Sequence, residues 1–204
     1  MNDIKTLRQQ AGLQAPTAIA PTKTALLLID FQMEYYSGGL PLPDGAAAAK
    51  NAADLIDWAD RVGVHVIHIH HVAGNPQSPL FTPGGKHVAP HPLVVPADHH
   101  QRVSKGLPSS FVGTGLHTLL QERAVDTLII TGLMTHMCVD STARDALSLG
   151  YKSIVAADAC ATRDLPDYAG NGVLPHRELH HFSLSALADR FAEVMSTKAI
   201  LGLA

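Results

Sequence analysis

Short apolar runs of strand length alternate with segments of helical periodicity along most of this chain. The first run, TALLLID at 24–30, is almost continuously apolar and ends at a carboxylate, as expected for a parallel strand covered on both faces. Further strands are predicted at 64–71, 100–104, 127–132, 153–157 and 191–195. Because strand and helix patterns alternate, right-handed crossovers follow, and the sequence predicts a doubly wound α/β sandwich.

The segments between the predicted strands carry helical patterns or turn residues. Helices are predicted at 45–61, 114–122, 139–150 and 177–190, with a last helical turn near the C-terminus. The proline-rich stretch 72–96 has no periodicity and is predicted to be a long loop, as is 158–175. Residues 1–21, where two prolines block a continued helix, are interpreted as an N-terminal arm ahead of one domain at 22–204.

Three reactive side chains follow predicted strands. Asp30 ends the first strand, Lys105 follows the third, and Cys138 lies on the turn that opens the helix after the fourth. In an open parallel sheet of order 3-2-1-4-5-6, ligands bind at the carboxyl ends of the strands, so we expect these residues on one rim. Neither GxGxxG nor GxxxxGK[ST] occurs, which removes most support for nucleotide binding.

Composition narrows the classes of partner. The chain of 204 residues is 46% hydrophobic and 16% charged, as globular proteins are, and its net charge of -3 offers no basic field for nucleic acid. No segment approaches the ~18 apolar residues that a membrane span requires, and the first residues lack an apolar signal segment. Two cysteines in a domain of this length do not form a disulfide framework, which favours reduced thiols. We therefore expect a cytoplasmic protein that acts on a small molecule, without nucleic acid or membrane partners.

Position alone leaves the roles of the reactive residues open. Cys138 at a helix start could be a nucleophile, because unpaired N–H groups and the positive end of the helix dipole favour thiolate over thiol. It could equally be a small buried residue of the core. Asp30 could cap a turn, and Lys105 could be an ordinary surface lysine. Cys160, in the apolar context VAADACATRD, is predicted to be structural.

Three segments of the chain resemble the signature segments of the isochorismatase-like cysteine hydrolases. They are LLLIDFQMEY around Asp30, VSKGLPSSFVGTGL around Lys105 and GLMTHMCVDSTARDA around Cys138, in the family's order. The resemblance implies a Rossmann-like three-layer α/β/α sandwich with a mostly parallel six-stranded sheet, and a catalytic triad of these three residues. It also implies a non-proline cis peptide at Leu133–Met134 and an oxyanion hole made by the N–H groups of Met134 and Cys138.

The resemblance alone does not fix the reaction. Isochorismatases proper cleave a vinyl ether and, as the family is known, lack this cysteine, so Cys138 points to the amidohydrolase branch. We expect hydrolysis of a C–N bond in a small amide, carbamoyl or ureido compound through a thioester. A vinyl-ether hydrolase and a redox or sensing module with a reversibly oxidised Cys138 remain alternatives. Related hydrolases are commonly oligomeric, and the apolar arm could pack on a neighbour, so we expect a dimer or tetramer.

Thirteen histidines raise the question of a metal. Nicotinamidases of this family bind a metal through an Asp and histidines just after the second strand, where this chain reads HIHHVAGN without an Asp-x-His pattern. We therefore expect no metal and no cofactor, with His68, His70 and His71 as the ligands to test. The residues predicted to line the substrate pocket, each close in sequence to the predicted triad, are Gln32, Tyr35, Phe111 and His136.

Overall fold

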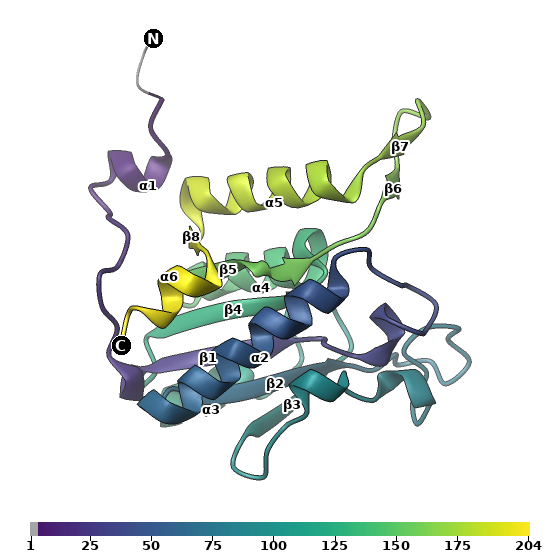
Figure 1. Ribbon diagram of the computed structural model, residues 1–204, viewed down its shortest axis with the longest axis horizontal. Coiled ribbons are helices and arrows are strands. Elements are labelled where there is room, and N and C mark those ends of the chain that lie inside the picture. The colour runs from purple at the N-terminus through teal and green to yellow at the C-terminus, as the bar shows by residue number, and fades with distance from the viewer. Residues whose placement is uncertain (1–3) are drawn as a thin grey trace.

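The central sheet of the protein has six parallel strands in the order β3-β2-β1-β4-β5-β8, as the computed structural model of residues 4–204 shows (Figure 1). All neighbouring strands in it run parallel. The strands are β1 Thr24–Ile29, β2 His65–His71, β3 Gln101–Lys105, β4 Thr127–Leu133, β5 Lys152–Ala161 and β8 Glu193–Met195. The predicted α/β fold is confirmed, and the strand order is the one assumed in the sequence analysis.

Helices cover both faces of this sheet and form the outer layers of the sandwich. Leu26 and Leu28 of β1 pack into one core with α2, whereas Leu27 and Ile29 point into the other core, with α3, α4 and α5. This alternation follows from the two-residue period of a strand, and it explains why β1 is apolar on both faces from Ala25 to Ile29. The helices are α1 Leu7–Gln10, α2 Gly45–Val62, α3 Leu116–Glu122, α4 Asp140–Ser148, α5 His176–Arg190 and α6 Thr197–Leu201.

Two segments differ from the sequence prediction. Strand β5 was expected to end at 157 but continues to Ala161, because Cys160 and Ala161 pair with the end of β4. Asp158 resembled a strand terminator, yet its carboxylate accepts hydrogen bonds from the backbone N–H and hydroxyl of Thr197, both at 2.7 Å. The rest of the predicted loop 158–175 contains a small antiparallel hairpin of β6 Leu165–Pro166 and β7 Val173–Leu174.

The turn after β4 also differs from the prediction. The helix expected over 139–150 begins earlier, as a π-helical turn at Thr135–Val139 that leads directly into α4. The peptide bond Leu133–Met134 is cis, as the family resemblance implied. Cys138 therefore lies inside a wide helical turn rather than at the first residue of an α-helix.

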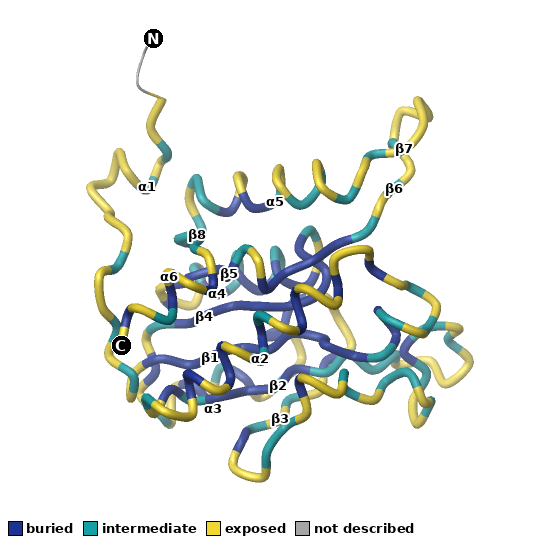
Figure 2. The backbone as a smooth tube through the Cα atoms, in the orientation of Figure 1, coloured by how far each residue is buried: buried dark blue, intermediate teal, exposed yellow. Residues whose placement is uncertain are grey.

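The N-terminal arm lies against its own chain. Its short helix α1 is closed by reciprocal hydrogen bonds between Thr6 and Gln9, and Arg8 forms an ion pair of 3.1 Å with Glu193. Figure 2 shows this arm as mainly exposed, in contrast to the buried strands. Exposed apolar side chains on it include Ile4, which is 94% accessible, and Leu13, at 47%. The first three residues of the predicted arm lie outside the described part of the chain, and homo-oligomerisation remains a prediction.

The long loop after β2 is irregular, as predicted. It contains short 3-10 turns at Lys86–Val88 and Pro92–Val94, and further 3-10 turns lie at Pro21–Lys23 and Met33–Tyr35. Across residues 4–204, no helix combines the length and apolarity needed to cross a bilayer.

Gly132 allows β4 to approach β1 next to the candidate site. Its φ is 151°, and a Cβ at this position would lie 2.4 Å from the carbonyl oxygen of Ile29. We expect Gly132→Ala to lower the free energy of unfolding by about 2–4 kcal/mol, since both backbone strain and overpacking oppose it. Urea denaturation would measure this, with the exposed Gly74→Ala as control, because a Cβ there meets nothing within 4 Å. Equal stability of Gly132→Ala and wild type would contradict the account.

Candidate active site

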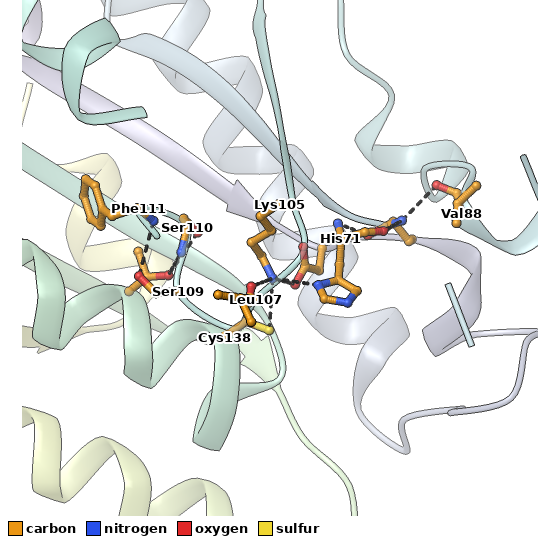
Figure 3. Close-up of polar contacts among 11 residues, drawn as sticks. His71, Val88, Lys105, Leu107, Ser109, Ser110, Phe111 and Cys138 are labelled. Atoms are coloured by element: carbon orange, nitrogen blue, oxygen red, sulfur yellow. Dashed lines mark hydrogen bonds and ion pairs between the residues drawn. The ribbon is translucent and has the colours of Figure 1, made fainter. Parts of the chain in front are cut away.

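Asp30, Lys105 and Cys138 converge at the carboxyl ends of the strands. The Nζ atom of Lys105 lies 2.7 Å from Oδ2 of Asp30 and 3.3 Å from Sγ of Cys138 (Figure 3). Asp30 directly follows β1, Lys105 is the last residue of β3, and Cys138 lies on the π-helical turn after β4. The sheet thus brings together three residues that are far apart in sequence, and the expectation of a common rim holds.

Lys105 is surrounded by acceptors. Besides Asp30 and Cys138, its ammonium group donates to the carbonyl oxygen of Leu107 at 3.2 Å. Nδ1 of His71 lies 3.5 Å away, because His71 and Lys105 are register partners on β2 and β3. Burial, and after it the positive charge of Lys105, lower the pKa of His71 to about 4. The His71 ring is therefore neutral near pH 7, and the neighbouring ammonium makes it a poor ligand for a metal cation.

The Asp30 carboxylate is fully buried. Burial raises the pKa of Asp30, opposed by the Lys105 charge, by hydrogen bonds from Lys105 and Cys138, and by the backbone of His71. A carboxylate with a raised pKa is a stronger base than one in water. Asp30 is thus suited to accept the proton of a neighbouring thiol, and Lys105 balances its charge.

The environment of Cys138 contradicts one expectation from the sequence. Its position at the start of a helix was expected to favour the thiolate over the thiol. Burial, followed by the negative charge of Asp30, raises the pKa of the Cys138 thiol to about 12, and Lys105 only partly offsets this. The side chain is 4% exposed, so water does not solvate a thiolate there. The resting group is a neutral thiol in contact with Lys105, which also contacts the buried carboxylate of Asp30, and it needs proton transfer to become a nucleophile.

The turn that carries Cys138 is anchored on both sides. The Thr135 hydroxyl lies 2.8 Å from Nδ1 of His180 on α5, and Nδ1 of His136 is hydrogen-bonded to the Thr162 hydroxyl just after β5. These contacts fix the turn of Cys138 against two neighbouring elements. His136 keeps its Nε2 buried without a partner among the described residues, so it retains a polar atom for a substrate.

The side chain of Gln32 is hydrogen-bonded to the backbone of two other segments. Its side-chain amide donates to the carbonyl oxygens of His71 at 2.9 Å and Val88 at 3.0 Å, and its Oε1 accepts from the N–H of His71 at 2.8 Å. Both amide hydrogens are therefore used. Gln32 holds the long loop against the end of β2, and these contacts do not support the predicted role in binding substrate.

The two aromatic candidates have different positions. Tyr35 is buried, and burial followed by the negative charge of Asp30 raises its pKa well above the ordinary value, so its phenol stays protonated beside the predicted triad. Phe111 instead stacks on Tyr151 with ring centroids 5.8 Å apart, and Figure 3 shows it away from Lys105 and Cys138. Its ring belongs to the core, which does not support a role in the pocket.

Arg163 was not predicted. Burial, and after it the positive charge of Arg163, lower the pKa of His136, and Nε of Arg163 is buried without a hydrogen-bond partner in the described chain. A half-buried guanidinium with a free N–H can face an anionic or carbonyl group of a substrate. Arg163 lies in the segment predicted to be a loop, where no sequence pattern distinguishes it from a solvated residue.

Comparison with known proteins agrees with the fold and the site. Residues 24–199 match the isochorismatase domain family. The chain is 36% identical to the uncharacterized isochorismatase family protein YddQ of Bacillus subtilis, over 87% of this chain and 98% of YddQ. It is 29% identical to a maleamate amidohydrolase of Pseudomonas putida, over 85% of this chain and 83% of that enzyme.

Solved structures show the same relationship. The crystal structure of an isochorismatase from Pseudomonas putida superposes with a TM-score of 0.88 and 34% identity, covering 96% of this chain and 98% of that one. The match of the family over nearly the whole domain, together with these relatives, shows that the chain belongs to the isochorismatase family of hydrolases.

Proposed function

We propose that this hydrolase cleaves a C–N bond in a small amide, carbamoyl or ureido compound through a thioester on Cys138. The observation that carries the proposal is the buried ammonium of Lys105, which contacts both the Cys138 thiol and the Asp30 carboxylate. A nucleophile next to a base that a third group orients is the arrangement of covalent catalysis. The similarity to a maleamate amidohydrolase supports an amide as the substrate.

In the first half-reaction, Cys138 attacks the carbonyl carbon while Asp30 accepts the thiol proton. The S–C bond forms and the carbonyl oxygen becomes an oxyanion, for which we assign the N–H groups of Met134 and Cys138 as donors. Collapse of this intermediate breaks the C–N bond, and Asp30 returns the proton to the leaving amine. A thioester remains. Losing one oxyanion donor typically raises a barrier by ~2.7–4 kcal/mol.

In the second half-reaction, Asp30 takes a proton from water, and the resulting hydroxide attacks the thioester carbon. The C–S bond then breaks, the acid is released, and Asp30 returns the proton to the Cys138 sulfur. Lys105 remains charged throughout. Its contacts to both Asp30 and Cys138 hold the base against the thiol and stabilise negative charge on sulfur while the proton is on Asp30.

The direct test of this function is ammonia release from a panel of small amides, carbamoyl compounds and ureides, with Cys138→Ala as the blank. At least one member is expected to release ammonia with the wild type only. Assays with isochorismate and with peroxide address the alternatives. Pyruvate release from isochorismate without any amidase activity would favour the vinyl-ether reaction, and peroxide reactivity of Cys138 without turnover of the panel would favour a redox role.

The pH dependence of kcat/KM follows from the site's pKa shifts. Asp30 must be ionised to act as a base, and its pKa is raised, so activity should fall with acid at a pH above the ordinary carboxyl value of 3.8. The Cys138 pKa is about 12, so no increase should accompany titration of an ordinary thiol near pH 8 to 9. A pH series of kcat/KM between pH 4 and 10 checks this. An activity that rises through pH 8 to 9 would show a preformed thiolate instead.

Three further properties belong to the proposal. Turnover requires no metal or cofactor, so chelation should leave kcat unchanged. The protein is cytoplasmic, and its partners are a small-molecule substrate and further copies of itself in a dimer or tetramer. Light scattering that gives a mass near 21.7 kDa at assay concentration would contradict the oligomer.

A further inference from the structure

Three potential metal ligands meet at the amino end of the sheet, at the far end of β3 from Lys105. Asp60 lies near the end of α2, and His99 and His100 directly precede β3. Oδ1 of Asp60 is 3.0 Å from Nε2 of His99 and 3.1 Å from Nε2 of His100. All three ligand atoms lie within 4.8 Å of one another, and residues 4–204 contain no second group of this kind.

These separations fit a transition-metal ion. With Zn–N and Zn–O bonds of about 2.0–2.2 Å, two ligand atoms at tetrahedral angles lie ~3.3–3.6 Å apart. The carboxylate and each imidazole nitrogen are therefore only a few tenths of an ångström too close, and small side-chain rotations would admit the ion. A set of two imidazoles and one carboxylate suits Zn²⁺ rather than Mg²⁺ or Ca²⁺, which prefer oxygen ligands.

The buried ligand has an orienting partner. Nδ1 of His100 lies 3.1 Å from Nε2 of the buried His68, within hydrogen-bond distance. When Nε2 of His100 binds a metal, its proton resides on Nδ1 and can be donated to His68. Metal-bound histidines usually make such a second contact. The backbone N–H of Ala97 also lies 3.1 Å from this Nδ1, so metal binding exchanges one hydrogen bond for another.

Space remains for further ligands. A cavity of about 390 Å³ adjoins the group, and its lining includes Asp60, His99, His100 and Arg123. The side chain of His99 is 68% exposed, that of Asp60 35% and that of His100 2%, so an ion can enter from solvent. Water or a small anion near Arg123 can complete a tetrahedron. The buried His100 would hold the ion in a fixed position, and the accessible His99 and Asp60 would let it enter from solvent.

We propose that Asp60, His99 and His100 form a site for Zn²⁺ or a similar divalent transition-metal ion, separate from the predicted triad. Lys105 is the fifth residue after His100 along this strand, about 16 Å away at the usual rise, so the ion does not touch the reacting atoms. It links the end of α2 to the start of the edge strand β3. Its effect is on stability: at a free Zn²⁺ concentration 100 times Kd, Tm rises by ~5–10 °C for a domain of this size.

The test compares metal-free wild type with His99→Ala and Asp60→Asn. Both changes are at accessible side chains, and His181→Ala, an exposed histidine on α5, is the matched control. Zn²⁺ titration by calorimetry, the Tm with and without Zn²⁺, and the absorption spectrum of added Co²⁺ are recorded for each. Wild type and His181→Ala should bind one Zn²⁺ with equal affinity and show a tetrahedral Co²⁺ band. His99→Ala and Asp60→Asn should bind Zn²⁺ at least about 100-fold more weakly and lose the band.

Two results would overturn the site: no Zn²⁺ binding to wild type in the micromolar range, or equal binding by wild type and His99→Ala. The second result would mean that ions bind other histidines on the surface. None of these measurements depends on turnover, so the outcome is independent of the proposed amidohydrolase activity.

Discussion

Replacing Cys138 by alanine is expected to lower kcat by at least about 10³-fold while the protein folds and binds substrate. The reason is that, among the described residues, no other thiol or hydroxyl is hydrogen-bonded to Lys105, the ion-pair partner of Asp30. Cys138→Ser should lose nearly as much, because the far less nucleophilic hydroxyl cannot replace sulfur in the thioester. Kinetics on the best substrate of the panel, with calorimetric binding to the inactive variants, would measure both effects.

Cys160→Ala is the matched control for Cys138. Cys160 is also buried, 5% exposed against 4%, and burial raises its thiol pKa to about 12 as well. Besides burial, the charge of Asp158 raises this pKa, and neither Asp30 nor Lys105 contributes to it, so Cys160→Ala should keep the wild-type turnover. Iodoacetamide should label Cys138 faster than Cys160, because Asp30 can remove only the proton of Cys138. Full activity in Cys138→Ala would end the hypothesis of covalent catalysis.

Asp30→Asn is expected to reduce both activity and stability. Turnover should fall by ~10²–10⁴-fold, since the variant lacks the base for both half-reactions. It also leaves the ammonium of Lys105 buried without its carboxylate, and breaking such a pair typically costs ~3–5 kcal/mol. Urea denaturation with activity assays would show the two losses separately. Lys105→Ala should lose less turnover than Asp30→Asn if lysine mainly orients the site.

A double variant separates loss of the base from loss of charge balance. Asp30→Asn with Lys105→Met removes both charges, so it should be more stable than Asp30→Asn alone while remaining inactive. If the single and double variants were equally stable, the ion pair would not be what holds this part of the rim together. If Asp30→Asn kept wild-type turnover, Asp30 would not be the base.

The topology of the sheet was predictable because burial on both faces leaves a direct mark on sequence. Strand β1 is buried at all six positions and apolar at the five after Thr24, and the alternation with helical segments predicts a parallel sheet, for which the doubly wound order is one of the common arrangements. That order brings Asp30 near Cys138 without any knowledge of side-chain contacts. The extension of β5 was missed because Asp158 and Cys160 resemble a loop until their partners, Thr197 and Gly132, are known.

The chemistry of the site was less predictable than its location. The position of Cys138 after a strand indicated a helix dipole, but its ionisation depends on burial and on the charge of Asp30, which only three-dimensional contacts reveal. The contacts of Gln32 and Phe111 were likewise visible only in three dimensions. The side-chain amide of Gln32 donates hydrogen bonds to backbone carbonyls of His71 and Val88, and the ring of Phe111 stacks on Tyr151. Sequence proximity to a reactive residue predicted their neighbourhood and not the direction of their side chains.

The central claim is that Cys138 carries the acyl group during turnover. The most direct measurement is acid quenching of the enzyme during reaction with the best substrate of the panel, followed by peptide mass mapping. The account predicts an added mass equal to the substrate less its leaving amine, on the peptide that contains Cys138 and not on the one that contains Cys160. An unmodified Cys138 together with wild-type turnover by Cys138→Ser would contradict it.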